Sequence, residues 1–210
     1  MVKGLDTLLS TSESSVSASF VPTLIQEVER RGGTEADVLG LPKLELESVA
    51  DFIVQKLHNI YRVEIDYSRP IEDMVIAGNY DCSNKSIHSE NFPVPPQFRR
   101  LGRVKVNLHL IPCKKQISYK EALLMLKSFG LRPGILPEQL AIGAAFPQKQ
   151  VECPIFQIGS LWPDRKGRRC TYLRKANKER MLAVAWTRYG FQPYYQIIAV
   201  DKRSDYLASV

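Results

Sequence analysis

Positive charge and aromatic rings are concentrated in one stretch of the chain. Lys and Arg heads neutralise phosphates, and aromatic rings stack on bases, so this composition is typical of polyanion binding. Trp162 and Tyr172 lie in or beside the stretch, and Trp186, Tyr189 and Tyr194 follow it. The residues predicted to bind a polyanion are Arg165, Lys166, Arg168, Arg169, Arg174, Lys175, Lys178 and Arg180. The alternative is that the charges solvate turns, and that the aromatic residues pack inside an antiparallel sheet, which we expect for most of them.

Formal charge divides the chain into an acidic and a basic half. Residues 1–98 hold 8 Lys and Arg against 15 Asp and Glu, and residues 99–210 hold 21 against 7. Two interpretations are open. The halves attract each other within the fold, or the basic half presents its field to a polyanion such as nucleic acid.

Residues that carry catalysis or bind metal do not form recognisable motifs. No G-x-S-x-G, phosphate-binding loop or C-x-x-C pair occurs. Cys82 and His88 would need two further metal ligands, from residues such as Asp81 or Glu90, and zinc sites favour closer pairs. The pairs Glu64/Asp66 and Glu72/Asp73 are explained by exposure of these carboxylates to solvent, without a catalytic role. We therefore predict no catalytic residue, no metal and no cofactor, and regard enzymatic activity as the less favoured alternative.

The four cysteines, Cys82, Cys113, Cys153 and Cys170, are far apart. The first residues lack the apolar run of a signal peptide, and no segment approaches the roughly 20 apolar residues of a membrane span. We therefore expect a cytoplasmic protein with reduced thiols. Cys170 follows two arginines, which would lower its pKa, but strand alternation favours a buried, inert thiol.

The acidic half predicts mostly helix. Residues 1–20 are Ser-rich and are expected to be a mobile leader, and residues 21–60 form an acidic helical unit. Helices are expected at 22–31, at 35–40 after a Thr34–Asp37 capping box, and at 46–58, where Val49, Ala50, Ile53 and Leu57 form a stripe. Residues 61–98 then supply a strand at 61–67, a helix at 68–78 capped by Ser68, and a long loop that we take as a domain boundary.

Residues 99–210 predict a basic α+β domain. A strand at 103–111 alternates, with Val104, Val106, Leu108 and Leu110 facing the core. A capping box of Ser118 and Glu121 begins a helix that ends at Gly130, whose stripe is expected to pack on this strand. The stripe consists of Tyr119, Ala122, Leu123, Leu126 and Phe129. A second helix starts at Pro137, and strands are expected at 155–162, 169–175, 181–186 and 194–200. The fold class is therefore α+β with a mainly antiparallel sheet.

Several phrases resemble those of known proteins. RRGGTEADVLGL, SYKEALLMLKSFGLRPGILPEQLAIGAAFP, PIFQIGSLWPDRKGRRCTYL and YYQIIAV resemble an uncharacterised bacterial family, which pairs a short helical unit with an aromatic-rich C-terminal α+β domain. LRPGILPEQ, between a helix and a second helix, also resembles the opening of C-type-lectin-like domains. The chain lacks the paired active-site cysteines of the formylglycine-generating enzymes in that group and the calcium-binding phrases of sugar-binding lectins. The resemblance therefore implies a fold and no activity.

We interpret the chain as a non-enzymatic binding or interaction protein. Its partner is an unidentified protein or ligand, with no membrane association. The alternative is a nucleic-acid-associated protein that uses the basic half.

Overall fold

The computed structural model describes residues 21–201, and the chain divides into two compact units, residues 1–50 and 51–210. In the first unit, residues 21–30 are helical and are followed by α2 (Glu35–Leu39). The predicted capping box is present, since Thr34 N donates to the Asp37 carboxylate at 2.7 Å and Asp37 N donates to Thr34 Oγ1 at 3.3 Å. Helix α3 (Lys43–His58) begins in the first unit and ends in the second.

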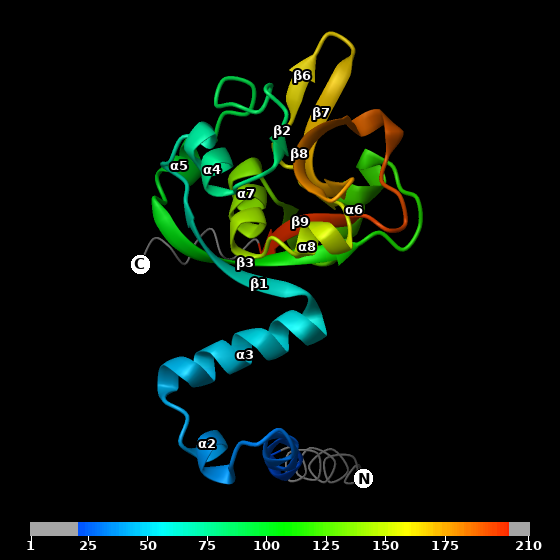
Figure 1. Ribbon diagram of the computed structural model, residues 1–210. Helices are drawn as coiled ribbons and strands as arrows, with labels where there is room; N and C mark the ends of the chain where they lie inside the picture. The colour runs from blue at the N-terminus through cyan, green and yellow to red at the C-terminus, as the bar shows by residue number, and fades with distance from the viewer. Residues whose placement is uncertain (1–20, 202–210) are drawn as a thin grey trace, which may run out of the picture. The chain divides into compact units, whose positions relative to one another are not determined.

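The second unit is built on one mixed sheet (Figure 1). Among the described residues the sheet has nine strands, and its main path runs β1-β3-β9-β5-β7-β8-β2. The strands are β1 (Ile60–Asp66), β2 (Cys82–Ser83), β3 (Arg103–Pro112), β4 (Leu131–Pro133), β5 (Ile155–Phe156), β6 (Trp162–Asp164), β7 (Gly167–Ala176), β8 (Glu179–Trp186) and β9 (Gln196–Asp201). Most neighbours are antiparallel, whereas β5–β9 and β2–β8 are parallel. The predicted α+β class is confirmed.

Helix α7 lies at the centre of one core. The other helices of this unit are α4 (Ile71–Ala77), α5 (Pro96–Arg99), α6 (Tyr119–Ser128) and α8 (Lys149–Glu152), with α7 spanning Leu136–Ala145. Pro137 occupies the first turn of α7, where its missing N–H leaves no bond unmade. Leu136 and Leu140 of α7 pack in one cluster with Val106, Leu108 and Leu110 of β3. The predicted alternation of β3 is confirmed, with Val104 only half-buried.

Helix α6 covers the opposite face of the sheet, which corrects the predicted packing. Leu126 of α6 clusters with Ile197 and Ala199 of β9, while Ile198 and Val200 of the same strand belong to the α7 core. The stripe of α6 is buried as expected at Ala122 and Leu126, but Phe129 is 60% exposed because it follows the last turn of the helix. A helical stripe shows that one face is buried and does not identify the face of the sheet that covers it.

Three local expectations also change. Helix α4 begins after Pro70, and Ser68 instead donates to Asp66, so Ser68 is no cap. The stripe of α3 is largely exposed, with Leu57 at 73%. The loop after α4 carries β2 and α5, and its Phe92 is buried in the same core as Leu108. Residues on both sides of the predicted boundary at residue 98 therefore share one core. The predicted leader at 1–20 lies outside the described residues.

Candidate functional site

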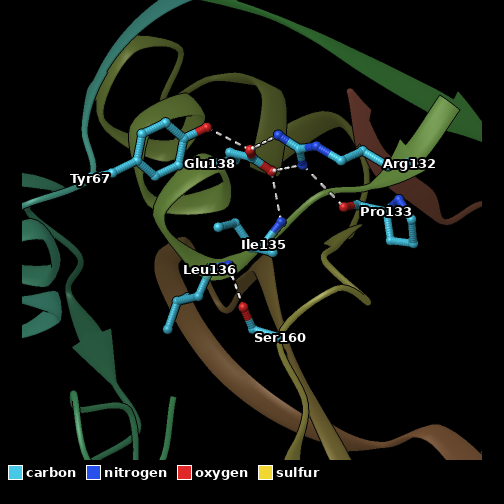
Figure 2. Close-up of polar contacts among 7 residues, drawn as sticks. All are labelled: Tyr67, Arg132, Pro133, Ile135, Leu136, Glu138 and Ser160. Atoms are coloured by element: carbon cyan, nitrogen blue, oxygen red, sulfur yellow. Dashed lines mark hydrogen bonds and ion pairs between the residues drawn. The ribbon is translucent and has the colours of Figure 1, made fainter. Parts of the chain in front are cut away.

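Glu138 is a fully buried carboxylate at the start of α7 (Figure 2). Arg132 of β4 donates to its two oxygens at 2.7 and 3.1 Å, and Tyr67, next to the end of β1, donates its hydroxyl at 2.6 Å. The backbone N–H of Ile135 donates a fourth bond at 2.7 Å. Because a carboxylate has about four acceptor positions, these donors fill it. Glu138 therefore joins β1, β4 and α7 and has no free lone pair for a substrate.

Tyr67 is held in its protonated form by the same arrangement. Burial raises the pKa of Tyr67, and the adjacent Glu138 carboxylate raises it further. The hydroxyl therefore remains a donor at neutral pH. Together with the adjacent bond from Leu136 N–H to Ser160 Oγ, this cluster is a structural clamp.

A second buried polar network crosses from α7 to the sheet. Gln139 donates its side-chain amide to Ile155 O at 2.8 Å and to Thr171 O at 3.1 Å. Thr171 Oγ1 donates back to the Gln139 carbonyl, and accepts from Gln157 at 2.9 Å. These side chains satisfy one another, so the network fixes α7 on β5 and β7.

Arg180, one of the predicted polyanion-binding residues, is used inside the fold. Its guanidinium donates to the carbonyls of Gly78, Asn79 and Gly143 at 3.1, 3.1 and 2.7 Å. The same group lies 5.2 Å from the ring centre of Tyr80. Arg180 therefore holds the end of α4, α7 and β8 together. Its two terminal nitrogens are engaged and its Nε is buried, so the guanidinium is not presented to an anion in solvent.

The other predicted cations lie at two opposite ends of β7. Arg165, Lys166 and Arg168 are exposed at and beside the β6–β7 turn, and Lys175 and Lys178 are exposed at the β7–β8 turn. A ten-residue strand separates the two groups by about 30 Å, at roughly 3.3 Å per residue. Arg174 is half-buried, 5.8 Å from the ring of Tyr172. The structure thus brings together only the first group as an exposed cluster.

Arginine and aromatic side chains alternate next to that exposed cluster. Arg169 is the register partner of Trp162 on β6 and of Trp186 on β8, and its guanidinium lies 4.8 and 4.1 Å from their ring centres. Arg188 follows β8 and lies 4.8 Å from Trp186 and 5.0 Å from Tyr189. We call this row Trp162–Arg169–Trp186–Arg188–Tyr189 the arginine–aromatic row. Asp164 forms an ion pair with Arg169.

Arg188 was not among the predicted site residues. It stands outside the dense run of cations, and its position two residues after Trp186 was the one sequence signal that connected it with that ring. Most of the remaining aromatic residues form core as expected. Tyr172 and Tyr195 each stack on Phe156 at 4.7 Å, and Phe191 packs edge-on against Phe156. Tyr194, by contrast, is 63% exposed.

A cavity of about 650 Å³ lies between α6 and the ends of β3, β4 and β9. Its apolar lining consists of Ile111, Pro112, Ile117, Leu124, Met125, Phe129 and Leu131. Lys114, Lys115, Glu121, His109 and Asp201 supply its polar groups. His109 Nε2 lies 3.3 Å from the Asp201 carboxylate. We call this site the α6 cavity. The sequence pattern did not indicate this cavity, because the stripe of α6 predicted Phe129 in the core.

Cysteine and metal chemistry receive no support from the described residues. Burial raises the pKa of Cys170 to about 12 and that of Cys113 to about 11, so both are protonated thiols at neutral pH. All four cysteines are free. Within residues 21–201 no three His, Cys, Asp or Glu side chains gather as a metal site, so Cys82 and His88 stay without further ligands there.

No protein-family model, no curated protein and no solved structure matches this chain. None of the helices in residues 21–201 has the length and apolar character required to cross a membrane.

Proposed function

We propose that the chain is a non-enzymatic binding protein whose ligand is an amphipathic small molecule, with an apolar body and an anionic head. The observation that carries this proposal is the α6 cavity, which combines an apolar lining with lysines at its border. Ligand sites typically have volumes of about 300–1,000 Å³, and 650 Å³ falls within that range.

The apolar part of the ligand is inferred from exposed side chains. Leu124 and Phe129 line the cavity and are 56% and 60% exposed. Covering apolar surface gains about 25 cal/mol per Å². A hydrocarbon or aromatic body that fills the cavity would therefore gain binding energy from both side chains.

The anionic head is inferred from which charged groups are already engaged. Glu121 accepts from Ser118 N and Oγ at 2.7 Å in the capping box, and these bonds lower the pKa of Glu121. Asp201 pairs with His109. Lys114 and Lys115 are exposed and form no ion pair within residues 21–201, and the charge of Lys115 also contributes to the lowered pKa of Glu121. A carboxylate or sulfonate at this border would be attracted by both lysines.

A fluorescent probe of matching chemistry tests this proposal. 8-Anilinonaphthalene-1-sulfonate has an aromatic body and an anionic head, and we expect it to bind to the full chain with enhanced emission. Leu124→Asp should abolish the enhancement, because a carboxylate then enters the apolar lining. Ile76→Asp is the matched control, since Ile76 is 76% exposed on α4 and is outside the cavity. Equal loss in both variants, or in neither, would contradict the proposal.

A second pair of variants tests the anionic head of the ligand. The double variant Lys114→Ala/Lys115→Ala should weaken binding of the sulfonate probe and leave binding of the uncharged N-phenyl-1-naphthylamine unchanged. Lys120→Ala/Lys127→Ala removes the same charge from other parts of α6, which do not line the cavity, and should change neither probe.

The second candidate function is binding of single-stranded nucleic acid, and the arginine–aromatic row favours it. Tyr189 is 63% exposed at one end of the row, beside the cations of the β6–β7 turn. Arg188 donates to Lys166 O at 3.4 Å, which joins the row to that turn. A base could stack on Tyr189 while Arg165, Lys166 and Arg168 contact phosphates.

The two ends of β7 provide a matched comparison for this second candidate. Arg168→Ala/Tyr189→Ala should reduce the affinity for a mixed-sequence single-stranded oligonucleotide, measured by fluorescence anisotropy. Lys175→Ala/Lys178→Ala should reduce it less, because these residues lie at the opposite end of the strand. Affinity should fall steeply with added salt, as counterion release requires. If the wild-type chain does not bind at low salt, nucleic acid is excluded as the ligand.

A further inference from the structure

The border strand β1 has an unpaired edge. Among the described residues only β3 pairs with β1, and Figure 1 shows β1 beside β3 at the border of the sheet. Leu110 N donates to Asn59 O at 3.0 Å, and Tyr67 N donates to Gly102 O at 2.9 Å, in the register of the β1–β3 ladder. Bonded pairs alternate in an antiparallel ladder. Since Asn59 and Tyr67 are odd-numbered, the N–H and C=O groups of Arg62 and Glu64 point to the free edge, whereas the C=O of Asp66 accepts from Arg69 N at 3.2 Å.

Charge along this edge changes from positive at Arg62 to negative at Glu64 and Asp66, which specifies a partner. Arg62, Glu64 and Asp66 have their side chains on one face of the sheet, opposite the core residues Tyr61, Val63 and Ile65. Within residues 21–201 no ion pair is recorded for Arg62, and Glu64 reaches Arg103 only at 3.6 Å with both side chains more than half exposed. Opposite charges directly across two strands stabilise a sheet, and like charges destabilise it.

Only one self-pairing of β1 satisfies both constraints. Two copies of β1 that pair antiparallel must match even-numbered residues with even-numbered residues, because these carry the free backbone groups. A symmetry axis at Arg62 opposes two arginines. An axis at Glu64 places Arg62 opposite Asp66 twice but opposes two glutamates at its centre. An axis at Val63 places Arg62 of each copy opposite Glu64 of the other copy, which gives two pairs of opposite charge. Val63 of one copy then lies opposite Val63 of the other.

A cavity borders part of this edge. A cavity of about 430 Å³ is lined by the C-terminal half of β1 and by α4 and α7. The α7 residues in its lining are Leu140 and the small side chains Ala141, Ala144 and Ala145. A two-fold axis perpendicular to the sheet keeps α7 of both copies on the same side, where small side chains allow close approach.

We propose that the chain forms a symmetric dimer by antiparallel pairing of β1 with β1 of a second copy, centred on Val63. The two sheets then become continuous across an isologous interface. The paired edge is short, so the dimer belongs to the weak and concentration-dependent class. This inference is independent of the ligand proposed for the α6 cavity.

Charge reversal tests the dimer and its register together. The mass of the full-length chain is measured by sedimentation equilibrium over a range of concentrations, and the wild type should show reversible dimerisation. Arg62→Glu opposes two carboxylates at each cross-strand pair, and Glu64→Lys opposes two cations there. Each variant alone should therefore weaken the dimer by roughly tenfold or more. An equimolar mixture should recover wild-type association, because both cross-strand pairs in the heterodimer have opposite charges.

Recovery in the mixture separates the proposal from misfolding, since an unfolded variant cannot be rescued in this way. Far-ultraviolet circular dichroism of each variant checks the fold. A wild-type chain that remains monomeric overturns the proposal. A dimer that survives both single variants also overturns it and would leave the β1 edge available to an extended peptide.

Discussion

Arg132 and Glu138 meet through two hydrogen bonds of 2.7 and 3.1 Å, with the carboxylate fully buried and the arginine side chain 14% exposed. This pair connects a short strand with the central helix of the second unit. Its geometry is bidentate, which is the strongest arrangement of these two groups. The pair therefore fixes α7 on the sheet whose opposite face carries α6 and the α6 cavity.

Removing the Glu138 carboxylate should lower the free energy of unfolding of the second unit. Glu138→Ala leaves Arg132 largely buried without its partner, and we expect a loss of about 3–5 kcal/mol in the free energy of unfolding. Tyr67→Phe removes one bond to the same carboxylate and should cost about 1.5–3 kcal/mol. Urea denaturation measures both values. Tyr194→Phe is the control, since Tyr194 is 63% exposed, and should change little. Equal stability of Tyr67→Phe and the wild type would show that the clamp does not stabilise the fold.

Gly143 marks a close contact between α7 and Tyr80. A methyl group added at Gly143 would overlap the Tyr80 hydroxyl and meet Leu173 Cδ1 at 3.0 Å. Gly143→Ala should therefore destabilise the chain by about 1–3 kcal/mol, as overpacking does. The double variant Gly143→Ala/Tyr80→Phe should recover part of this loss, because the overlapping hydroxyl is gone. Thermal unfolding of the wild type and of both variants measures the effect, and a double variant less stable than Gly143→Ala would contradict it.

Substitutions of Leu108 and Leu124 compare a core residue with a residue that lines the α6 cavity. Leu108 is fully buried on β3, so Leu108→Ala should cost about 2–5 kcal/mol of unfolding free energy. Leu124→Ala should cost much less, because Leu124 is 56% exposed, but it should weaken binding of the fluorescent probe. A Leu124→Ala variant as destabilised as Leu108→Ala would mean that α6 depends on this side chain for packing.

Stability should decrease in alkaline solution because two thiols are buried. Burial raises the pKa of Cys170 from 9.0 to about 12. Above pH 9 the unfolded thiol loses its proton while the folded thiol keeps it, so the free energy of unfolding falls as pH rises from 9.0 towards about 12. Below pH 9 this contribution is constant. Urea denaturation of the reduced protein along this range measures the slope, which should be shallower in Cys170→Ala. An identical slope in the variant would contradict the assignment.

Local patterns were sufficient to predict most elements. The capping boxes at Thr34 and Ser118 involve residues three positions apart. The alternation of apolar and polar residues in β3 shows directly which of its side chains are buried, so neither prediction depends on distant contacts. Which face of the sheet α6 covers depends on the order of the strands, and an apolar stripe on one helix carries no information about that order. Phe129 was therefore assigned to the core although it borders the α6 cavity.

The candidate sites depend even more on long-range register. Arg180 was grouped with exposed cations because its neighbours in sequence are charged, yet its partners Gly78 and Asn79 lie about a hundred positions earlier in the chain. The arginine–aromatic row forms only when β6, β7 and β8 align Arg169 with both tryptophans. Composition identified the region, and strand pairing decided which side chains in it act together.

An NMR titration of the ¹⁵N-labelled full chain with 8-anilinonaphthalene-1-sulfonate tests the proposed ligand site most directly. We expect the amide shifts to concentrate on α6, β4 and the adjoining ends of β3 and β9, with saturation at one site. Shifts confined to the β6–β7 turn, or the absence of any saturable shift, would contradict it.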